Sequence, residues 1–161
     1  MNIFEFALEF EKESEQFYRD LAANCETPGL KNILILLAED EVKHYHTISA
    51  MRNGGLPEMA PTQVLPSARD LFAAMKDDLD QISSGADEIE LYRAALGKED
   101  QAEQFYREQA ADSSDPQGAA LLLRLADEER RHRFLIENII EFLSRPKTWV
   151  EDAEFNHLEE Y

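Results

Sequence analysis

Cysteine, proline and glycine are all scarce in this chain. The single cysteine, Cys25, excludes an intramolecular disulfide framework and a metal site built from four cysteines of this chain. The 6 prolines lie outside the long stretches with helical periodicity, and only 6 glycines are present, which favours an all-helical protein. The longest unbroken apolar run, residues 33–38, is far too short to cross a bilayer, so no membrane segment is expected.

Positive charge is also in short supply. The chain has 16 Lys and Arg against 34 Asp and Glu, which gives a formal net charge of −18. Such an acidic chain is a poor partner for nucleic acid or for an anionic membrane surface. The first residues are acidic, and no basic region precedes an apolar one, so we predict no secretory signal and expect a cytoplasmic protein.

What the chain does contain is helical periodicity. With 161 residues and 43% hydrophobic content, it suits one domain with a sizeable core. Apolar spacing and capping signals predict long helices over residues 2–23, 28–52, 87–111 and 116–143, with a shorter one over about 68–82. We therefore expect a helical bundle over residues 1–145, followed by a tail over 146–161 with a short helix from about Thr148.

The long helices form two similar pairs. When the chain is shifted by 88 positions (129 − 41 = 88), Glu41 falls on Glu129 and His44 falls on His132 without a gap. The segment EKESEQFYRDLA at 11–22 falls on EDQAEQFYREQA at 99–110 in the same register. A repeated helix hairpin implies approximate two-fold symmetry, so a single site on the axis would draw the same ligand types from both halves.

Each half carries a Glu-x-x-His pair, Glu41 with His44 and Glu129 with His132. Three residues turn a helix by about 300°, so the carboxylate and the imidazole lie on one face, one turn apart. One such pair is weak evidence, and the tail holds a third, Glu154 with His157, that has no repeat partner. Two pairs in register predict half of a dinuclear metal site inside a bundle, with one more carboxylate needed from each remaining helix.

Glu11 and Glu99 are the predicted remaining carboxylates. Each lies seven residues before a tyrosine, Tyr18 or Tyr106, on the same helix face, and each recurs in register. Glu15 and Glu103 recur as well, one turn further along; they could act around the site or along a route into it, or simply lie on a solvated edge.

These residues favour particular metals. Clustered carboxylates in an apolar interior repel one another, and two divalent cations would balance four of them. Oxygen-rich ligation with one imidazole per ion suits iron, or alternatively manganese, better than a structural zinc site. Two such ions close together could react with O2 or hydrogen peroxide. Tyr18 and Tyr106 are placed to hydrogen-bond ligand carboxylates.

The two repeated segments, ALEFEKESEQFYRDLA with LAEDEVKHYHTI and GKEDQAEQFYREQA with LADEERRHRFLI, resemble the ferritin-like diiron superfamily, and most closely its rubrerythrin-type branch. The resemblance implies a four-helix bundle with a long crossover between its second and third long helices. It also implies a diiron-carboxylate oxidoreductase that reduces peroxide or oxidises ferrous iron. The six implied metal ligands are Glu11, Glu41, His44, Glu99, Glu129 and His132. We expect the four glutamates, with Tyr18 and Tyr106, to serve catalysis.

Two departures from the rubrerythrin pattern refine this reading. A rubredoxin domain holds iron with four cysteines, and one cysteine cannot do so; any electrons must therefore come from an external donor protein. Rubrerythrins also carry an extra glutamate where this chain has Ala102, which implies a symmetric six-ligand site. The alternatives are a ferritin-type storage cage and a non-catalytic metal-binding module. A homodimer is expected.

Overall fold

The computed structural model describes residues 2–75 and 86–144. These residues form five helices and no strand: α1 (Ile3–Ala23), α2 (Pro28–Arg52), α3 (Val64–Met75), α4 (Ala86–Asp112) and α5 (Pro116–Ser144). The prediction of an all-α protein is confirmed for this part of the chain. None of its helices is long and apolar enough to cross a membrane. The predicted helix in the tail lies outside the described residues.

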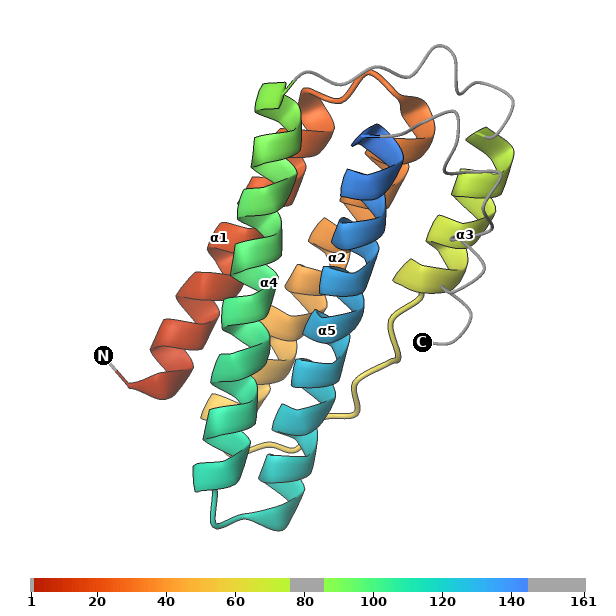
Figure 1. Ribbon diagram of the computed structural model, residues 1–161. Helices are drawn as coiled ribbons and strands as arrows, with labels where there is room; N and C mark the ends of the chain where they lie inside the picture. Colours follow the sequence, from red (N-terminus) through yellow and green to blue (C-terminus); the bar gives the residue numbers. More distant parts are fainter. Residues whose placement is uncertain (1, 76–85, 145–161) are drawn as a thin grey trace.

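Four long helices lie side by side in two antiparallel hairpins, α1 with α2 and α4 with α5 (Figure 1). The crossover after α2 lets α4 begin at the same end of the molecule as α2, so these two helices run parallel, as the long connection predicts. Both hairpins pack together through α1 with α4 and α2 with α5. This arrangement is consistent with a four-helix bundle, and α3 covers α2 and α5 from one side.

The helix ends follow the sequence signals closely. Asn2 Oδ1 accepts a hydrogen bond of 2.8 Å from Glu5 N at the start of α1, and Asp115 Oδ1 accepts one of 3.2 Å from Gln117 N at the start of α5. After α2, Gly54 adopts a φ of 87°, a conformation that favours glycine. The predicted termini of the long helices therefore lie within a residue or so of the observed ones.

The predicted start of the short helix was wrong. The helix was predicted from about residue 68 because Ser67, three residues before Asp70, resembles a cap, but α3 begins at Val64, so Ser67 lies inside its first turn. Proline is tolerated in a first helical turn, and Pro66 takes that place. Thr62 Oγ1 accepts a hydrogen bond of 3.2 Å from Val64 N and so acts as the cap. The predicted end at residue 82 lies outside the described residues.

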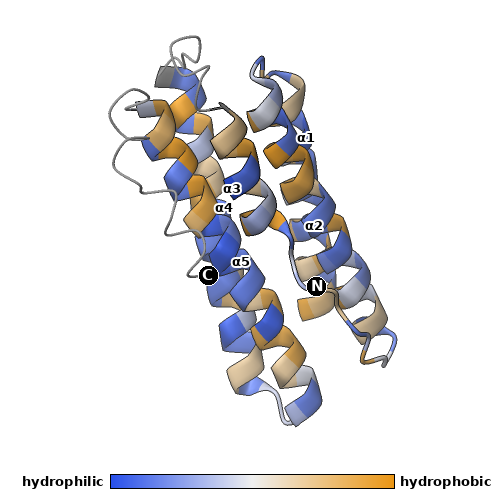
Figure 2. Cartoon of the chain, turned by 90° about the vertical axis from the view of Figure 1, so that its right-hand side faces the viewer, coloured by the Kyte–Doolittle hydropathy of each residue, from blue (hydrophilic) through white to orange (hydrophobic). Residues whose placement is uncertain are grey.

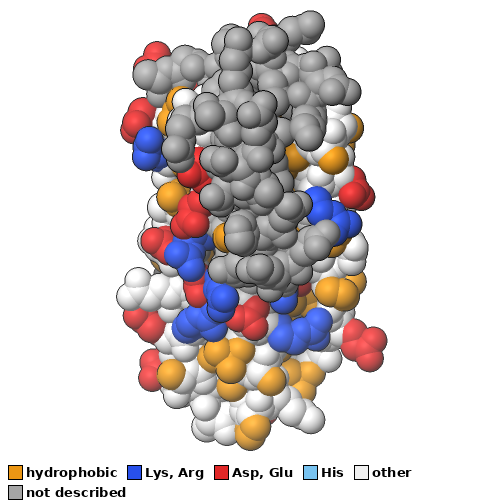
Figure 3. Space-filling view, turned by 45° about the vertical axis from the view of Figure 1, so that its right-hand side comes forward, with side chains coloured by type: hydrophobic (Ala, Val, Ile, Leu, Met, Phe, Trp, Pro, Cys, Tyr) orange, Lys and Arg blue, Asp and Glu red, His pale blue; other side chains and the backbone are white. Residues whose placement is uncertain are grey.

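The buried core consists of two apolar clusters with a polar layer between them. One cluster packs the end of the bundle that α3 covers and includes Leu34, Phe72 and Ile136. The other packs the opposite end and includes Ile48 and Leu125. Each long helix carries both hydrophobic and hydrophilic residues along its length (Figure 2). On the face that Figure 3 shows, Lys and Arg side chains lie among Asp and Glu.

Candidate metal centre

The six side chains predicted as metal ligands lie together in the polar layer. Their exposed fractions are all 2% or less. They form two groups, and within each group the possible ligand atoms lie within 4.8 Å of one another. The first group is Glu11, Glu41, His44 and Glu129, and the second is Glu41, Glu99, Glu129 and His132. Each of the four long helices contributes, because one carboxylate comes from α1 and one from α4, and a Glu-x-x-His pair comes from each of α2 and α5.

Glu41 and Glu129 belong to both groups. They come from α2 and α5, and each lies close to the imidazole of the other hairpin. His44 Nδ1 is 2.8 Å from Glu129 Oε1, and His132 Nδ1 is 2.9 Å from Glu41 Oε1. The two imidazole rings lie nearly parallel, with centroids 5.6 Å apart. The geometry therefore has the pseudo-symmetry that the repeat predicts, with the two shared carboxylates at its centre.

The inner atoms of this centre fit a metal site. Glu11 Oε2, Glu41 Oε1, both carboxylate oxygens of Glu129 and the Nδ1 atoms of His44 and His132 are buried and make no hydrogen bond. Buried polar atoms that lack a hydrogen bond are rare in folded proteins, and here the two Nδ1 atoms have carboxylates of the same centre beside them as ion-pair partners. Two ligand atoms that bind one cation at right angles, each about 2.1 Å from it, lie about 3 Å apart. The distance from each Nδ1 atom to its nearest carboxylate oxygen, 2.8 or 2.9 Å, is close to this spacing.

The two carboxylates outside the shared pair stay ionised. Burial by itself would raise the pKa of Glu11, but a hydrogen bond with Glu41 and the charge of His44 outweigh it and lower this pKa to about 2. Burial acts the same way on Glu99, and the charge of His132 again outweighs it and lowers the pKa. Each non-shared carboxylate is thus paired with one imidazole.

The shared carboxylates behave in the opposite way. Burial, together with the charges of Glu11 and Glu129, raises the pKa of Glu41 well above its usual value. Burial and the charges of Glu99 and Glu11 do the same for the pKa of Glu129. Without metal, these two groups therefore retain protons that a bound cation would displace.

Both histidines are driven toward the charged form. Burial alone would lower the pKa of His44, but the charges of Glu129 and Glu11 raise it well above the usual value. Burial acts in the same direction on His132, and the charge of Glu99 again raises the pKa. The opposite charges of the imidazoles and the carboxylates offset one another, which lowers the cost of burying six ionisable groups.

Two tyrosines bind the non-shared carboxylates across the hairpins. The Tyr18 hydroxyl on α1 donates a hydrogen bond to Glu99 Oε1 on α4, and the Tyr106 hydroxyl on α4 donates one to Glu11 Oε1 on α1. Burial and the charges of Glu99 and Glu11, respectively, raise the pKa values of these phenols, so both remain protonated donors. The tyrosines lie where the sequence predicts a hydrogen bond to a ligand carboxylate.

Sequence reasoning missed the two carboxylates behind the histidines. Asp40 Oδ2 lies 2.8 Å from His132 Nε2, and Glu128 Oε1 lies 2.8 Å from His44 Nε2. Each bond crosses from one hairpin to the other, and each leaves the Nδ1 atom facing the centre. A signal was present, because 128 − 40 is again 88, so the two acids recur at the same offset as the ligands.

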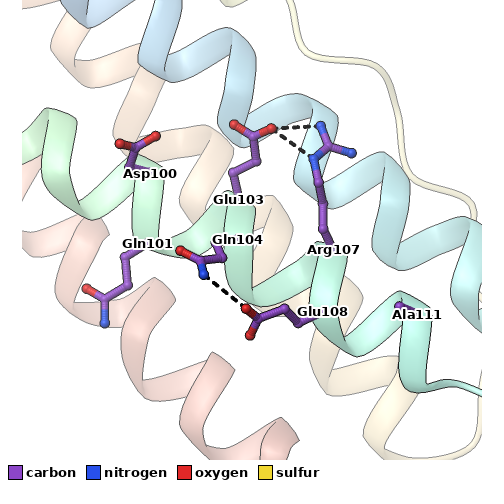
Figure 4. A pocket seen from close by; sticks show the side chains of 7 residues that line it. All are labelled: Asp100, Gln101, Glu103, Gln104, Arg107, Glu108 and Ala111. Atoms are coloured by element: carbon purple, nitrogen blue, oxygen red, sulfur yellow. Dashed lines mark hydrogen bonds and ion pairs between the residues drawn. The ribbon is translucent and has the colours of Figure 1, made fainter.

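Glu15 and Glu103 are partly buried, with side-chain exposed fractions of 29% and 14%, and each pairs with an arginine. Glu15 Oε2 is 2.6 Å from Arg19 Nε, and Glu103 Oε2 is 2.8 Å from Arg107 Nη2. Figure 4 shows Glu103 with Arg107 beside an open surface hollow of about 690 Å³ along α4. None of the six ligands lines that hollow. These contacts hold both glutamates in ion pairs with arginines rather than with the six candidate ligands.

Comparisons of the chain with models of known protein families, with curated proteins and with solved structures found no match. Over the residues that the structure describes, the helices and the buried groups define an all-helical fold with carboxylates and histidines that could hold a dinuclear metal site.

Proposed function

We propose that the chain is a ferritin-like bundle that binds two iron ions, with manganese as the alternative, and reacts with hydrogen peroxide or O2. The observation that carries the proposal is that two four-residue ligand groups share Glu41 and Glu129. Carboxylates shared between two groups are suited to bridging two ions, and one imidazole per group suits iron. The segments that resemble rubrerythrins contain all six of these ligands.

The bound ions would supply the two electrons that break an O–O bond. With two ferrous ions held by these residues, each ion would give up one electron, and H2O2 would need two protons besides these two electrons to yield two waters. The protein's part is to hold the ligands and exclude water. Tyr18 and Tyr106 fix the carboxylates of Glu99 and Glu11, while outer hydrogen bonds at Nε2 orient both imidazoles.

Turnover needs an external reductant. The single cysteine cannot supply a four-cysteine iron site, so we propose that a separate electron-donor protein returns the ferric ions to the ferrous state. The bundle itself would act as a homodimer. Sedimentation analysis checks the assembly, since a particle of hundreds of kilodaltons would favour ferritin-type storage instead.

The decisive test is anaerobic loading with Fe²⁺, followed by rapid mixing with H2O2 or with O2. We expect two irons per chain and the appearance of ferric absorption together with loss of the oxidant. Glu11→Gln should prevent tight binding of the ion beside His44, because Glu11 belongs to that ligand group. Glu13→Gln is a matched control, because Glu13 lies on the exposed side of the same helix. Iron that binds but reacts with neither oxidant would favour a non-catalytic module.

A further inference from the structure

The two acids behind the histidines occupy equivalent repeat positions but have different surroundings. Glu128 Oε1, which contacts His44 Nε2, also lies 2.8 Å from Lys43 Nζ. The exposed fraction of the Glu128 side chain is 3%, so this ion pair is shielded from water on one side. An ammonium group on the oxygen that accepts the imidazole N–H draws electron density away from it and weakens that acceptor.

Asp40 has a neutral partner in place of that direct cation. Its Oδ2 atom contacts His132 Nε2 and accepts a hydrogen bond from the Thr62 hydroxyl. Lys43 Nζ lies farther away, at 3.6 Å, and faces the other oxygen, Oδ1. The carboxylate behind His132 therefore keeps more of its negative charge for the imidazole than the carboxylate behind His44 does.

The source of this difference is the crossover between α2 and α3. It is part of the connection that joins the two repeats, so it occurs once and cannot obey their two-fold symmetry. Its Ala60 carbonyl accepts a hydrogen bond of 2.8 Å from Lys43 Nζ, and its Thr62 contacts Asp40. The segment is anchored by Met59, which is buried in the core and whose carbonyl accepts a 2.5 Å hydrogen bond from Arg124. Lys43 Nζ is thus held closer to the acid behind His44, at 2.8 Å from Glu128, than to the acid behind His132, at 3.6 Å from Asp40.

We propose that the crossover makes the two cation positions unequal, so that the position built on His132 fills before the position built on His44. The inference rests on the proposed metal centre. A more basic Nδ1 and a more distant ammonium both favour a cation beside His132. Changes in the hydrogen-bonded surroundings of a metal ligand typically alter affinity by about 10–100-fold, so we expect two binding steps separated by about tenfold or more.

Anaerobic calorimetric titration of the full chain with Mn²⁺, and separately with Fe²⁺, tests the inference without any turnover. The native chain should show one tight and one weaker step, each of one ion. His44→Ala should keep the tight step, and His132→Ala should abolish it. Equal effects of the two substitutions, or loss of the tight step in His44→Ala, would overturn the proposal.

A charge substitution keeps the test sharp if either histidine variant fails to fold. Lys43→Met should tighten the weaker step by about tenfold and bring the two steps together. Lys12→Met changes the net charge equally on the exposed face of α1 and should leave both steps unchanged. Two equal steps in the native chain would refute the inequality while leaving the proposed function intact, whereas no binding at all would remove both.

Discussion

At the scale of single residues, the two buried tyrosines show how the hairpins depend on each other. Tyr106 belongs to α4 but holds Glu11 on α1, and Tyr18 belongs to α1 but holds Glu99 on α4. Each hydroxyl stabilises an ionised carboxylate in an interior that otherwise disfavours charge. A ligand is thus held in place by the hairpin opposite to its own.

Removing one of these hydroxyls should weaken metal binding. Tyr106→Phe leaves Glu11 without its hydrogen-bond donor. We therefore expect the affinity for the ion beside His44 to fall by about 10–100-fold. Calorimetric titration with Mn²⁺ measures the change. Tyr45→Phe, in a partly buried ring on α2, is the control and should have little effect. Equal affinity in Tyr106→Phe and the native chain would contradict this role of the hydroxyl.

The sequence predicted the ligand positions better than it predicted what lies behind them. The six candidate ligands could be brought together from the sequence because matching residue types recur in register on predictable helix faces. Asp40 and Glu128 recur as well, but each is turned about 100° from the neighbouring ligand, and only the approach of α2 to α5 shows that they reach the imidazoles. Thr62 gave no such signal, because it belongs to a segment without a repeat.

At the scale of the helices, the polar layer depends on the apolar clusters that enclose it. Leu125 and Leu123 are two positions apart on α5, yet Leu125 is fully buried while the exposed fraction of Leu123 is 43%. The first lies in the cluster beneath the metal centre, and the second faces outward.

These two leucines make a matched pair for a stability measurement. Leu125→Ala removes buried methyl groups and should lower the free energy of unfolding by about 2–5 kcal/mol. Leu123→Ala should change it by less than about 0.5 kcal/mol. Urea denaturation monitored by circular dichroism compares the two. Similar losses from both would contradict the assignment of the core.

Two glycines in or next to helices should respond to alanine in opposite ways. Gly54 has a φ of 87°, so Gly54→Ala strains the turn after α2 and should cost about 1 kcal/mol. Gly97 lies within α4, and an added Cβ would meet no atom within 4 Å, so Gly97→Ala should stabilise the fold by up to about 1 kcal/mol. Thermal unfolding gives both signs; a destabilised Gly97→Ala variant would show that glycine is required there.

Helix boundaries were predictable where two local signals agreed. Asn2 with Glu5, and Asp115 with the proline after it, mark starts that the structure reproduces. The start of α3 was wrong because Ser67 resembled a cap, while Pro66 fits equally well inside a first turn. Local sequence did not distinguish these two possibilities; the hydrogen bond from Val64 N to Thr62 does.

At the scale of the whole molecule, protons and metal ions would compete for the buried groups of the proposed metal centre. Without metal, the pKa values of Glu41, Glu129 and both histidines are raised. These four groups therefore keep their protons at pH values above their usual pKa. Loading two divalent ions should therefore release up to about four protons and should tighten as the pH rises.

The stability of the metal-free protein should fall with rising pH, whereas the stabilisation by bound metal should grow with rising pH. A group whose folded pKa is raised stabilises the fold below its unfolded pKa, about 6.5 for histidine, and loses that contribution as the pH rises through the folded pKa. The metal-free protein should thus have a falling Tm above about pH 6.5. Added Mn²⁺ should raise Tm, and more so at higher pH. Calorimetry at several pH values checks this; a metal-free Tm that climbs steadily above neutrality would contradict it.

We propose that two cations bind between the hairpins, with Glu41 and Glu129 shared between them. Anomalous diffraction from crystals of the iron-loaded protein, with elemental analysis of the same sample, tests it most directly. We expect two iron peaks per chain in the polar layer, each beside the Nδ1 atom of one histidine. A single peak, or iron found only on the outer surface of the helices, would contradict it.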